Sequence, residues 1–280
     1  MRLRLIAPVL CLTMLPVPLL AGLITFSTGN PDGKMATASR PDIGVFEIES
    51  ADDFVLTAPS RIDSATFQGI LTGGAKLSDI GQVDVEIYRV FPKDSTIPPS
   101  NNVPTRVNSP SDNAFDARDS GGGTLSFAAN VLSQSFSVLN SVQPGGIVLH
   151  SGGDGPVTGV QVEFDVTFTP PFLLPADHYF FVPQVQLSTG DFLWLSAPKP
   201  IVPPGTPFPP GFTDLQSWTR DANLDPDWMR IGTDVVGGTP APTFNAVFSL
   251  NGAEVPEPAT WLLAGAGLLG FLARRAVARS

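Results

Sequence analysis

Apolar and polar residues alternate with a period of two along much of the middle of the chain. The clearest run covers 160–168, where valine and phenylalanine occupy every even position and polar residues the odd ones. This alternation puts one set of side chains on each face of an extended segment and predicts a half-buried β-strand. No stretch of the middle region shows a comparable helical period. The same pattern predicts strands over 65–71, 83–87, 132–139, 179–187, 191–195 and 245–250.

Glycine-rich turn sequences separate the predicted strands, at 73–74, 121–123, 144–146 and 152–155. Such residues reach positive φ at little cost and suit closely spaced chain reversals. The predicted fold is therefore all-β, with two antiparallel sheets packed as a β-sandwich of jelly-roll type. Residues 51–56 and 62–67 are similar to the first strands of jelly-roll domains in secreted bacterial proteins, which implies the same architecture and raises carbohydrate binding as a function.

Two segments of the middle region look irregular. Residues 92–123 are rich in polar residues, proline and glycine and are predicted to form a long loop, while 198–210 contains seven prolines and favours extended backbone. The proline segment is either a linker to a second unit or a crossing within one domain. Because the roughly 40 residues after it would form a small core alone, a single domain over 39–254 is expected.

The N-terminus has the composition of a secretory signal. Arg2 and Arg4 precede an apolar run over 5–24, and Ala36-Thr37-Ala38 fits a small-residue cleavage site. Residues 1–38 are therefore predicted to be a signal peptide that contains a short apolar helix and is used by the Sec machinery. An uncleaved membrane anchor is the alternative, although prolines within the run disfavour a permanent helix.

The C-terminus combines a short motif, an apolar stretch and a cluster of arginines. About 15 apolar residues would give roughly 22 Å of helix, which is short for a ~30 Å hydrocarbon core. The arginines favour a cytoplasmic end for this short transmembrane helix. The residues that define the segment are Val255, Pro256, Glu257 and Pro258 before the apolar stretch and Arg274 and Arg275 after it.

This order of features over 255–280 resembles the PEP-CTERM sorting signal of Gram-negative bacteria. The resemblance implies that a membrane-embedded exosortase recognises the segment and cleaves near Pro-Glu-Pro. It also implies transient anchoring in the inner membrane, a final place at the cell surface or outside the cell, and an association with exopolysaccharide. It covers only about 25 residues and says nothing of the task of the middle region.

The charge of the middle region excludes one class of partner. Residues 39–255 hold 10 basic and 24 acidic residues, a net charge of −14. Such a domain repels phosphate backbones, so nucleic acid is not expected to bind. The single cysteine, Cys11, lies in the N-terminal apolar run, so the processed protein has neither a disulfide nor a cysteine metal ligand.

The sequence contains no recognisable catalytic motif. It has two histidines and lacks the signatures of zinc proteases, serine hydrolases and P-loop enzymes. No catalytic residue is predicted, and the acidic pair Asp52-Asp53 is expected to be a solvated surface feature. A secreted hydrolase of glycans or esters stays open as the alternative to a structural or binding role in the envelope or extracellular matrix.

Two groups of residues suggest ligands. In residues 221–227, oxygen-bearing side chains at alternate positions resemble the first half of a calcium loop. Two positions depart from that pattern: Pro226 replaces the turn glycine, and Gly232 stands at the position of the bidentate glutamate. Two interpretations stay open, a less regular Ca²⁺ site and an ordinary polar loop. No other cofactor is expected. Tryptophans near the proline segment could stack on sugar rings or be buried. The calcium candidates are Asp221, Asn223, Asp225 and Asp227, and the sugar candidates are Trp194, Trp218 and Trp228.

Overall fold

The computed structural model describes residues 22–95, 104–222, 227–255 and 267. Residues 23–255 form one compact unit, which is described here by itself. The two predicted terminal helices, and the predicted sorting residues other than Val255, lie outside the described residues. Where the chain is described, no helix is both long and apolar enough to cross a membrane.

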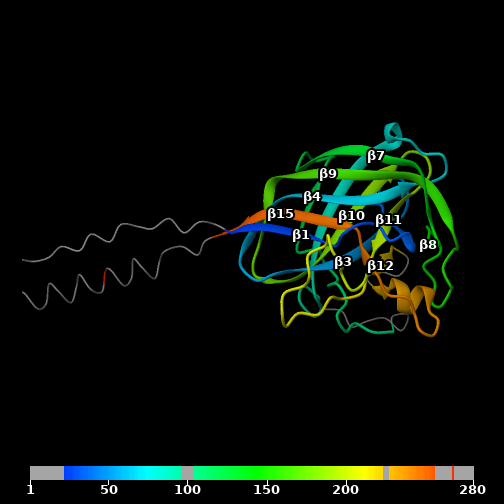
Figure 1. Cartoon of the computed structure of the whole chain (residues 1–280). Helices are drawn as coiled ribbons and strands as arrows, with labels where there is room; N and C mark the ends of the chain where they lie inside the picture. Colours follow the sequence, from blue (N-terminus) through cyan, green and yellow to red (C-terminus); the bar gives the residue numbers. More distant parts are fainter. Residues whose placement is uncertain (1–21, 96–103, 223–226, 256–266, 268–280) are drawn as a thin grey trace, which may run out of the picture. The chain divides into compact units, whose positions relative to one another are not determined.

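The described strands form two sheets (Figure 1). The larger sheet has the order β1-β15-β4-β11-β2-β8, with β9 paired to β4, β7 to β9 and β14 to β11. Its strands are β1 (Leu23–Ser27), β2 (Met35–Ala38), β4 (Ser60–Leu71), β7 (Leu125–Val138), β8 (Asn140–Val142), β9 (Val157–Leu174), β11 (Phe192–Ala197), β14 (Asn245–Ala246) and β15 (Phe248–Glu254).

The smaller sheet has the order β13-β12-β3-β10-β5-β6. Two short helical turns, η1 (Leu77–Asp79) and η2 (Ile231–Val236), complete the described elements. The strands of this sheet are β3 (Ile48–Leu56), β5 (Ile80–Arg89), β6 (Asp116–Asp119), β10 (Asp177–Leu187), β12 (Trp218–Asp221) and β13 (Met229–Arg230).

The alternation in β9 sorts its side chains as predicted. Val162, Phe164 and Val166 are buried, whereas Asp165 and Thr167 are exposed. The apolar face of this strand packs toward the smaller sheet, since its buried residues share one core with residues of β3, β5 and β10. The predicted antiparallel sandwich is confirmed, with β2 and β8 as a parallel pair within it.

Aromatic rings fill the space between the sheets. Phe67 of β4 stacks on Phe164 of β9 at 4.8 Å between ring centroids, and Phe181 of β10 stacks on Phe248 of β15 at 4.9 Å. The second pair joins the two sheets, because β10 and β15 belong to different ones. Without a disulfide, this core supplies the stability of the domain.

One prediction about an irregular segment is corrected. The segment 92–123, expected to be a loop, contains the edge strand β6, which pairs with β5. Strands β1 and β2 lie within 1–38, the segment expected to be removed as a signal peptide. The proline segment 198–210 contains no strand, and the backbone N–H of Thr206 donates to the carbonyl oxygen of Ser27 at the end of β1.

Candidate functional site

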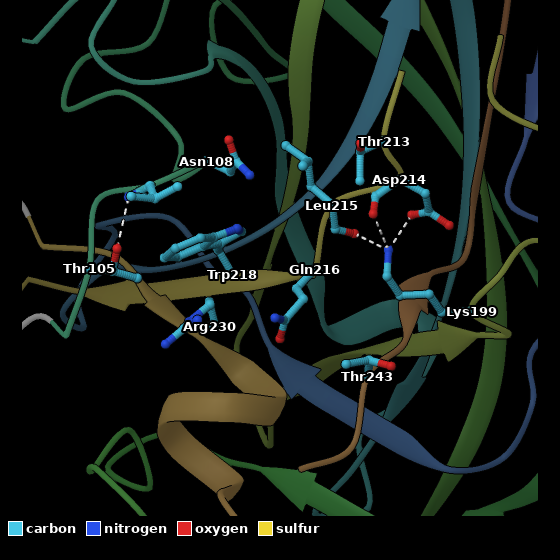
Figure 2. Close-up of a pocket in the computed structure, with 11 residues that line it drawn as sticks. Thr105, Asn108, Lys199, Thr213, Asp214, Leu215, Gln216, Trp218, Arg230 and Thr243 are labelled. Carbon is cyan, nitrogen blue, oxygen red and sulfur yellow. Dashed lines mark hydrogen bonds and ion pairs between the residues drawn. The ribbon is translucent and has the colours of Figure 1, made fainter. Parts of the chain in front are cut away.

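An open cavity of about 360 Å³ lies at the side of the smaller sheet (Figure 2). Five stretches of the chain form its walls: residues 105–108, residue 199 shortly after β11, residues 213–218, residue 230 of β13, and residue 243. Most of the lining residues have polar side chains; the lining is made by Thr105, Val107, Asn108, Lys199, Thr213, Asp214, Leu215, Gln216, Trp218, Arg230 and Thr243.

Two adjacent carboxylates of β3 hold the segment 213–217 in place. Both side-chain oxygens of Asp53 lie 3.1 Å from the backbone nitrogen of Leu215, which donates to them. Oδ1 of Asp52 accepts from the hydroxyl of Ser217 at 2.8 Å, and its Oδ2 accepts from the backbone N–H of Ala246 at 2.8 Å. The cavity wall is thus fixed from the buried strand beneath it.

The two cations of the cavity wall are neutralised within the protein. Nζ of Lys199 lies 2.5 Å from Oδ1 of Asp214 and also donates to the backbone oxygens of Asp214 and Leu215 (Figure 2). The guanidinium of Arg230 donates to both carboxylate oxygens of Asp234. The cavity therefore presents hydrogen-bonding groups with little net charge.

Trp218 lies in the lining of this cavity and carries a buried, unsatisfied donor. Its side chain is 1% exposed, and its indole Nε1 has no hydrogen-bond partner among the described residues. The other two described indoles are satisfied, since Nε1 of Trp194 donates to the carbonyl of Val247 and Nε1 of Trp228 to that of Ser111. Of the tryptophans that the structure describes, Trp218 is thus the one whose indole N–H has no acceptor.

The predicted sugar-stacking tryptophans are all buried. Exposed fractions of 2% for Trp194, 1% for Trp218 and 0% for Trp228 leave no indole face at the surface, so of the two alternatives the structure shows burial. The three rings are buried because they pack against other apolar residues: Trp218 and Trp228 on the outer face of the smaller sheet, and Trp194 between the sheets. A contact between Trp218 and a ligand in the cavity stays a prediction.

The expectation that Asp52 and Asp53 lie on a solvated surface is also wrong. Both are buried, and burial raises the pKa of each carboxyl, that of Asp52 well above its usual range. The neighbouring charge of Asp53 raises the pKa of Asp52 further. The hydrogen bonds to Ser217 and Leu215 oppose this shift and compensate part of the cost of burial.

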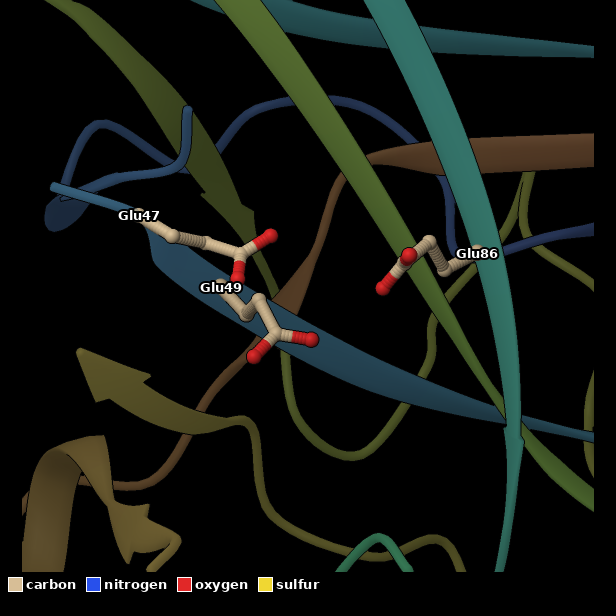
Figure 3. A group of neighbouring side chains, drawn as sticks. All are labelled: Glu47, Glu49 and Glu86. Carbon is tan, nitrogen blue, oxygen red and sulfur yellow. The ribbon is translucent and has the colours of Figure 1, made fainter. Parts of the chain in front are cut away.

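A second acidic group joins two strands of the smaller sheet (Figure 3). Glu47 precedes β3, Glu49 lies on β3 and Glu86 lies on β5, and one oxygen from each lies within 4.8 Å of the others. The hydroxyl of Tyr88 lies 2.5 Å from Oε1 of Glu49 and 2.8 Å from Oε2 of Glu86. The guanidinium of Arg220 pairs with Glu49.

The environment of Glu86 favours its neutral form. Burial, and then the charge of Glu49, raises the pKa of Glu86 to about 8. At neutral pH Glu86 is therefore mostly protonated and can donate a hydrogen bond within the cluster. Sequence reasoning missed this cluster; the available signal was that Glu86 lies on the polar side of the alternating strand β5, facing away from the core between the sheets.

The predicted calcium residues are only partly described. Asn223 and Asp225 lie outside the described residues, while Asp221 ends β12 and Asp227 is fully buried. The acidic cluster that the structure does bring together, Glu47 with Glu49 and Glu86, involves none of them. Calcium binding at 221–227 stays a prediction.

The segment that follows β15 carries the signal by which the protein is sorted. Strand β15 ends at Glu254, and residues 254–276 match the family model of the PEP-CTERM protein-sorting motif. The chain carries a PEP-CTERM sorting motif. It is therefore an exported protein targeted to an exosortase, as the resemblance over 255–280 implied.

The match places the sorting residues in a single segment of this PEP-CTERM protein. Val255, Pro256, Glu257 and Pro258, together with Arg274 and Arg275, all fall inside it. The motif names the processing partner and a membrane-anchored sorting signal, not the ligand of the domain. No curated protein and no solved structure is significantly similar to the chain.

Proposed function

We propose that this PEP-CTERM protein is a non-catalytic binding protein of the cell envelope or extracellular matrix. The ligand is a neutral sugar unit of an extracellular polysaccharide, bound in the cavity beside Trp218. The observation that carries the proposal is the unpaired Nε1 donor of that buried indole. A buried donor without a partner costs about 1–3 kcal/mol, and a ligand hydroxyl that accepts from it recovers this cost.

The chemistry of the cavity supports a neutral sugar. Thr105, Thr213, Thr243 and Asn108 supply hydroxyl and amide groups, while Leu215 supplies an apolar surface. A sugar ring offers the same mixture of hydroxyl and C–H groups. The cavity volume of about 360 Å³ falls within the roughly 300–1,000 Å³ typical of ligand sites.

The charges of the domain disfavour an acidic sugar. Lys199 is paired with Asp214 and Arg230 with Asp234, so neither cation is left uncompensated for a carboxylate or sulfate. The net charge of −14 over 39–255 adds long-range repulsion. Neutral saccharides are therefore favoured over uronic acids or sulfated sugars.

The carboxylates near the cavity support binding without turnover. Glycoside hydrolysis needs two carboxyl groups facing the bond to be cleaved, roughly 5–10 Å apart. Asp214 is the one carboxylate in the described lining, and Lys199 engages it. Asp52 and Asp53 point their oxygens at backbone and side-chain donors of the protein instead.

The test measures binding of a panel of neutral and acidic glycans to the exported protein, followed by calorimetric titration of each hit. Trp218→Phe removes the indole N–H and keeps an aromatic ring, so affinity for a neutral glycan should fall about tenfold, equivalent to about 1.4 kcal/mol. Trp228→Phe is the matched control, because that indole is also buried but does not line the cavity. The Trp228→Phe variant should bind the glycan with the affinity of the wild type.

Two results would overturn the proposal. One is the absence of binding to every neutral glycan, and the other is equal affinity of the Trp218→Phe variant and the wild type. Circular dichroism spectra of all three proteins show that a change in affinity does not reflect unfolding.

The hydrolase alternative has one observation in its favour, the raised pKa of Glu86 beside Glu49. A carboxyl that stays protonated at neutral pH can act as a general acid. Turnover of glycoside or ester substrates by the wild type, abolished in Glu86→Gln, would favour this alternative. Binding without turnover favours the proposed role.

A further inference from the structure

The N-terminal strand β2 lies in the interior of the larger sheet. All four of its residues, Met35–Ala38, are buried. The strand pairs with β11 on one side, where Thr37 lies opposite Trp194, and with β8 on the other, where Met35 lies opposite Asn140. A strand with partners on both sides cannot be removed without exposing two rows of backbone hydrogen-bonding groups.

Strand β1 pairs along its whole length with β15. The register runs from Leu23 opposite Ala253 to Ser27 opposite Ser249. Its side chains also reach the core, since the ring of Phe26 lies 5.4 Å from that of Phe248, centroid to centroid. Figure 1 shows the two strands side by side.

The residue after β1 ties the two strands together through its side chain. The hydroxyl of Thr28, which is buried, donates to the carbonyl oxygen of Ala246 at 2.6 Å and accepts from the backbone N–H of Phe248 at 2.9 Å. Loss of Thr28 would leave that N–H of the core strand without its partner, at a cost typical of a buried unsatisfied donor.

These contacts are incompatible with removal of residues 1–38. We propose that residues 23–38 are retained in the exported protein, so that any signal cleavage falls before Leu23 rather than after Ala38. The retained strand β1 then clamps β15, the strand that runs directly into the sorting motif at Glu254. Ala36 and Ala38 are small because β2 is closely packed, and not because a peptidase must recognise them.

The pairing has a consequence for the sorting segment. Because Leu23 lies opposite Ala253, the N-terminal export segment and the C-terminal sorting segment join the domain at neighbouring strand ends. Both segments can be cut away from this edge while every described strand keeps its partners.

The test is N-terminal sequencing and intact-mass measurement of the protein recovered from the envelope or medium of the producing cells. An N-terminus anywhere from residue 1 to residue 23 is the expected result. An N-terminus at Ser39 would overturn the proposal. This outcome is independent of glycan binding, so the two proposals fail separately.

A pair of substitutions tests the clamp in the full chain. Phe26→Ala removes a ring that packs on the core and should lower Tm by roughly 4 °C or more. Leu23→Ala is the matched control on the same strand, because Leu23 is 82% exposed, and should leave Tm unchanged. Equal melting temperatures for Phe26→Ala and the wild type would overturn the role of β1.

Discussion

Nε2 of His178 lies 2.6 Å from Oδ2 of Asp53, and the two side chains form a pair that joins β10 to β3. The same carboxylate accepts from the backbone N–H of Leu215, a residue that lines the cavity. Through Asp53, strands β3 and β10 of the smaller sheet are therefore hydrogen-bonded to a residue that lines the proposed ligand site.

Asp53→Ala should destabilise the domain and weaken ligand binding. The substitution leaves the buried N–H of Leu215 without an acceptor, which costs about 1–3 kcal/mol of the free energy of unfolding. Asp63→Ala is the control, because Asp63 forms an exposed pair with Arg61 and should cost less than about 0.5 kcal/mol. Urea denaturation measures both, and equal stability of the two variants would refute the role given to Asp53.

Glu86 should make the domain less stable as the pH rises. Its pKa is raised in the folded state to about 8 from the ordinary 4.5, so the folded protein binds this proton more tightly than the unfolded chain. Its contribution is fully present below about pH 4.5 and is lost as the pH rises through about 8.

Glu86→Gln tests this dependence. Urea denaturation from pH 5 to pH 9 gives the free energy of unfolding of the variant and of the wild type. As the pH rises, the variant should become more stable relative to the wild type. Asp165→Asn is a control, since Asp165 is exposed on β9. A difference that is constant with pH would contradict the assignment.

Phe164→Ala should be among the most damaging core substitutions. Phe164 is fully buried and contacts the rings of Phe67 and Phe192. A cavity of this size in a core costs about 3–5 kcal/mol. Leu132→Ala on the neighbouring strand β7 should cost far less because Leu132 is half exposed, and a loss in Phe164→Ala no greater than in that control would contradict the packing described here.

The sequence predicted the fold class because single strands carry their own signal. The alternation at 160–168 and 83–87 survives in the burial of β9 and β5, and Arg89, which breaks the phase, is the last residue of β5. The sorting motif was predictable for the same reason, since its residues are contiguous and need no tertiary structure to be recognised.

The N-terminal boundary is hard to predict from sequence because a cleavage site and a closely packed strand favour the same residues. Small side chains at Ala36 and Ala38 suit a cleavage site, and they equally suit a strand packed between two others. The apolar residues of β1 continue the apolar run of the export segment without a break in composition. The pairing of β1 with β15 is what distinguishes β1 from the export segment before it.

The candidate site could not be predicted, since its partners are distant in sequence. Asp53 and Leu215 are separated by 162 positions, and no local pattern shows that they meet. The acidic residues of a strongly acidic chain give no sign of which ones are buried. For the tryptophans, burial was predictable from their low number, but the unpaired Nε1 of Trp218 was not.

This chain is an exported protein targeted to an exosortase, and processing of its sorting segment can be measured. The most direct measurement is the intact mass of the protein in a Gram-negative host that expresses an exosortase and in the matched strain that lacks it. We expect loss of the segment beyond the Pro256–Pro258 region in the first strain and its retention in the second. The same C-terminus in both strains, with Ser280 still attached, would contradict it.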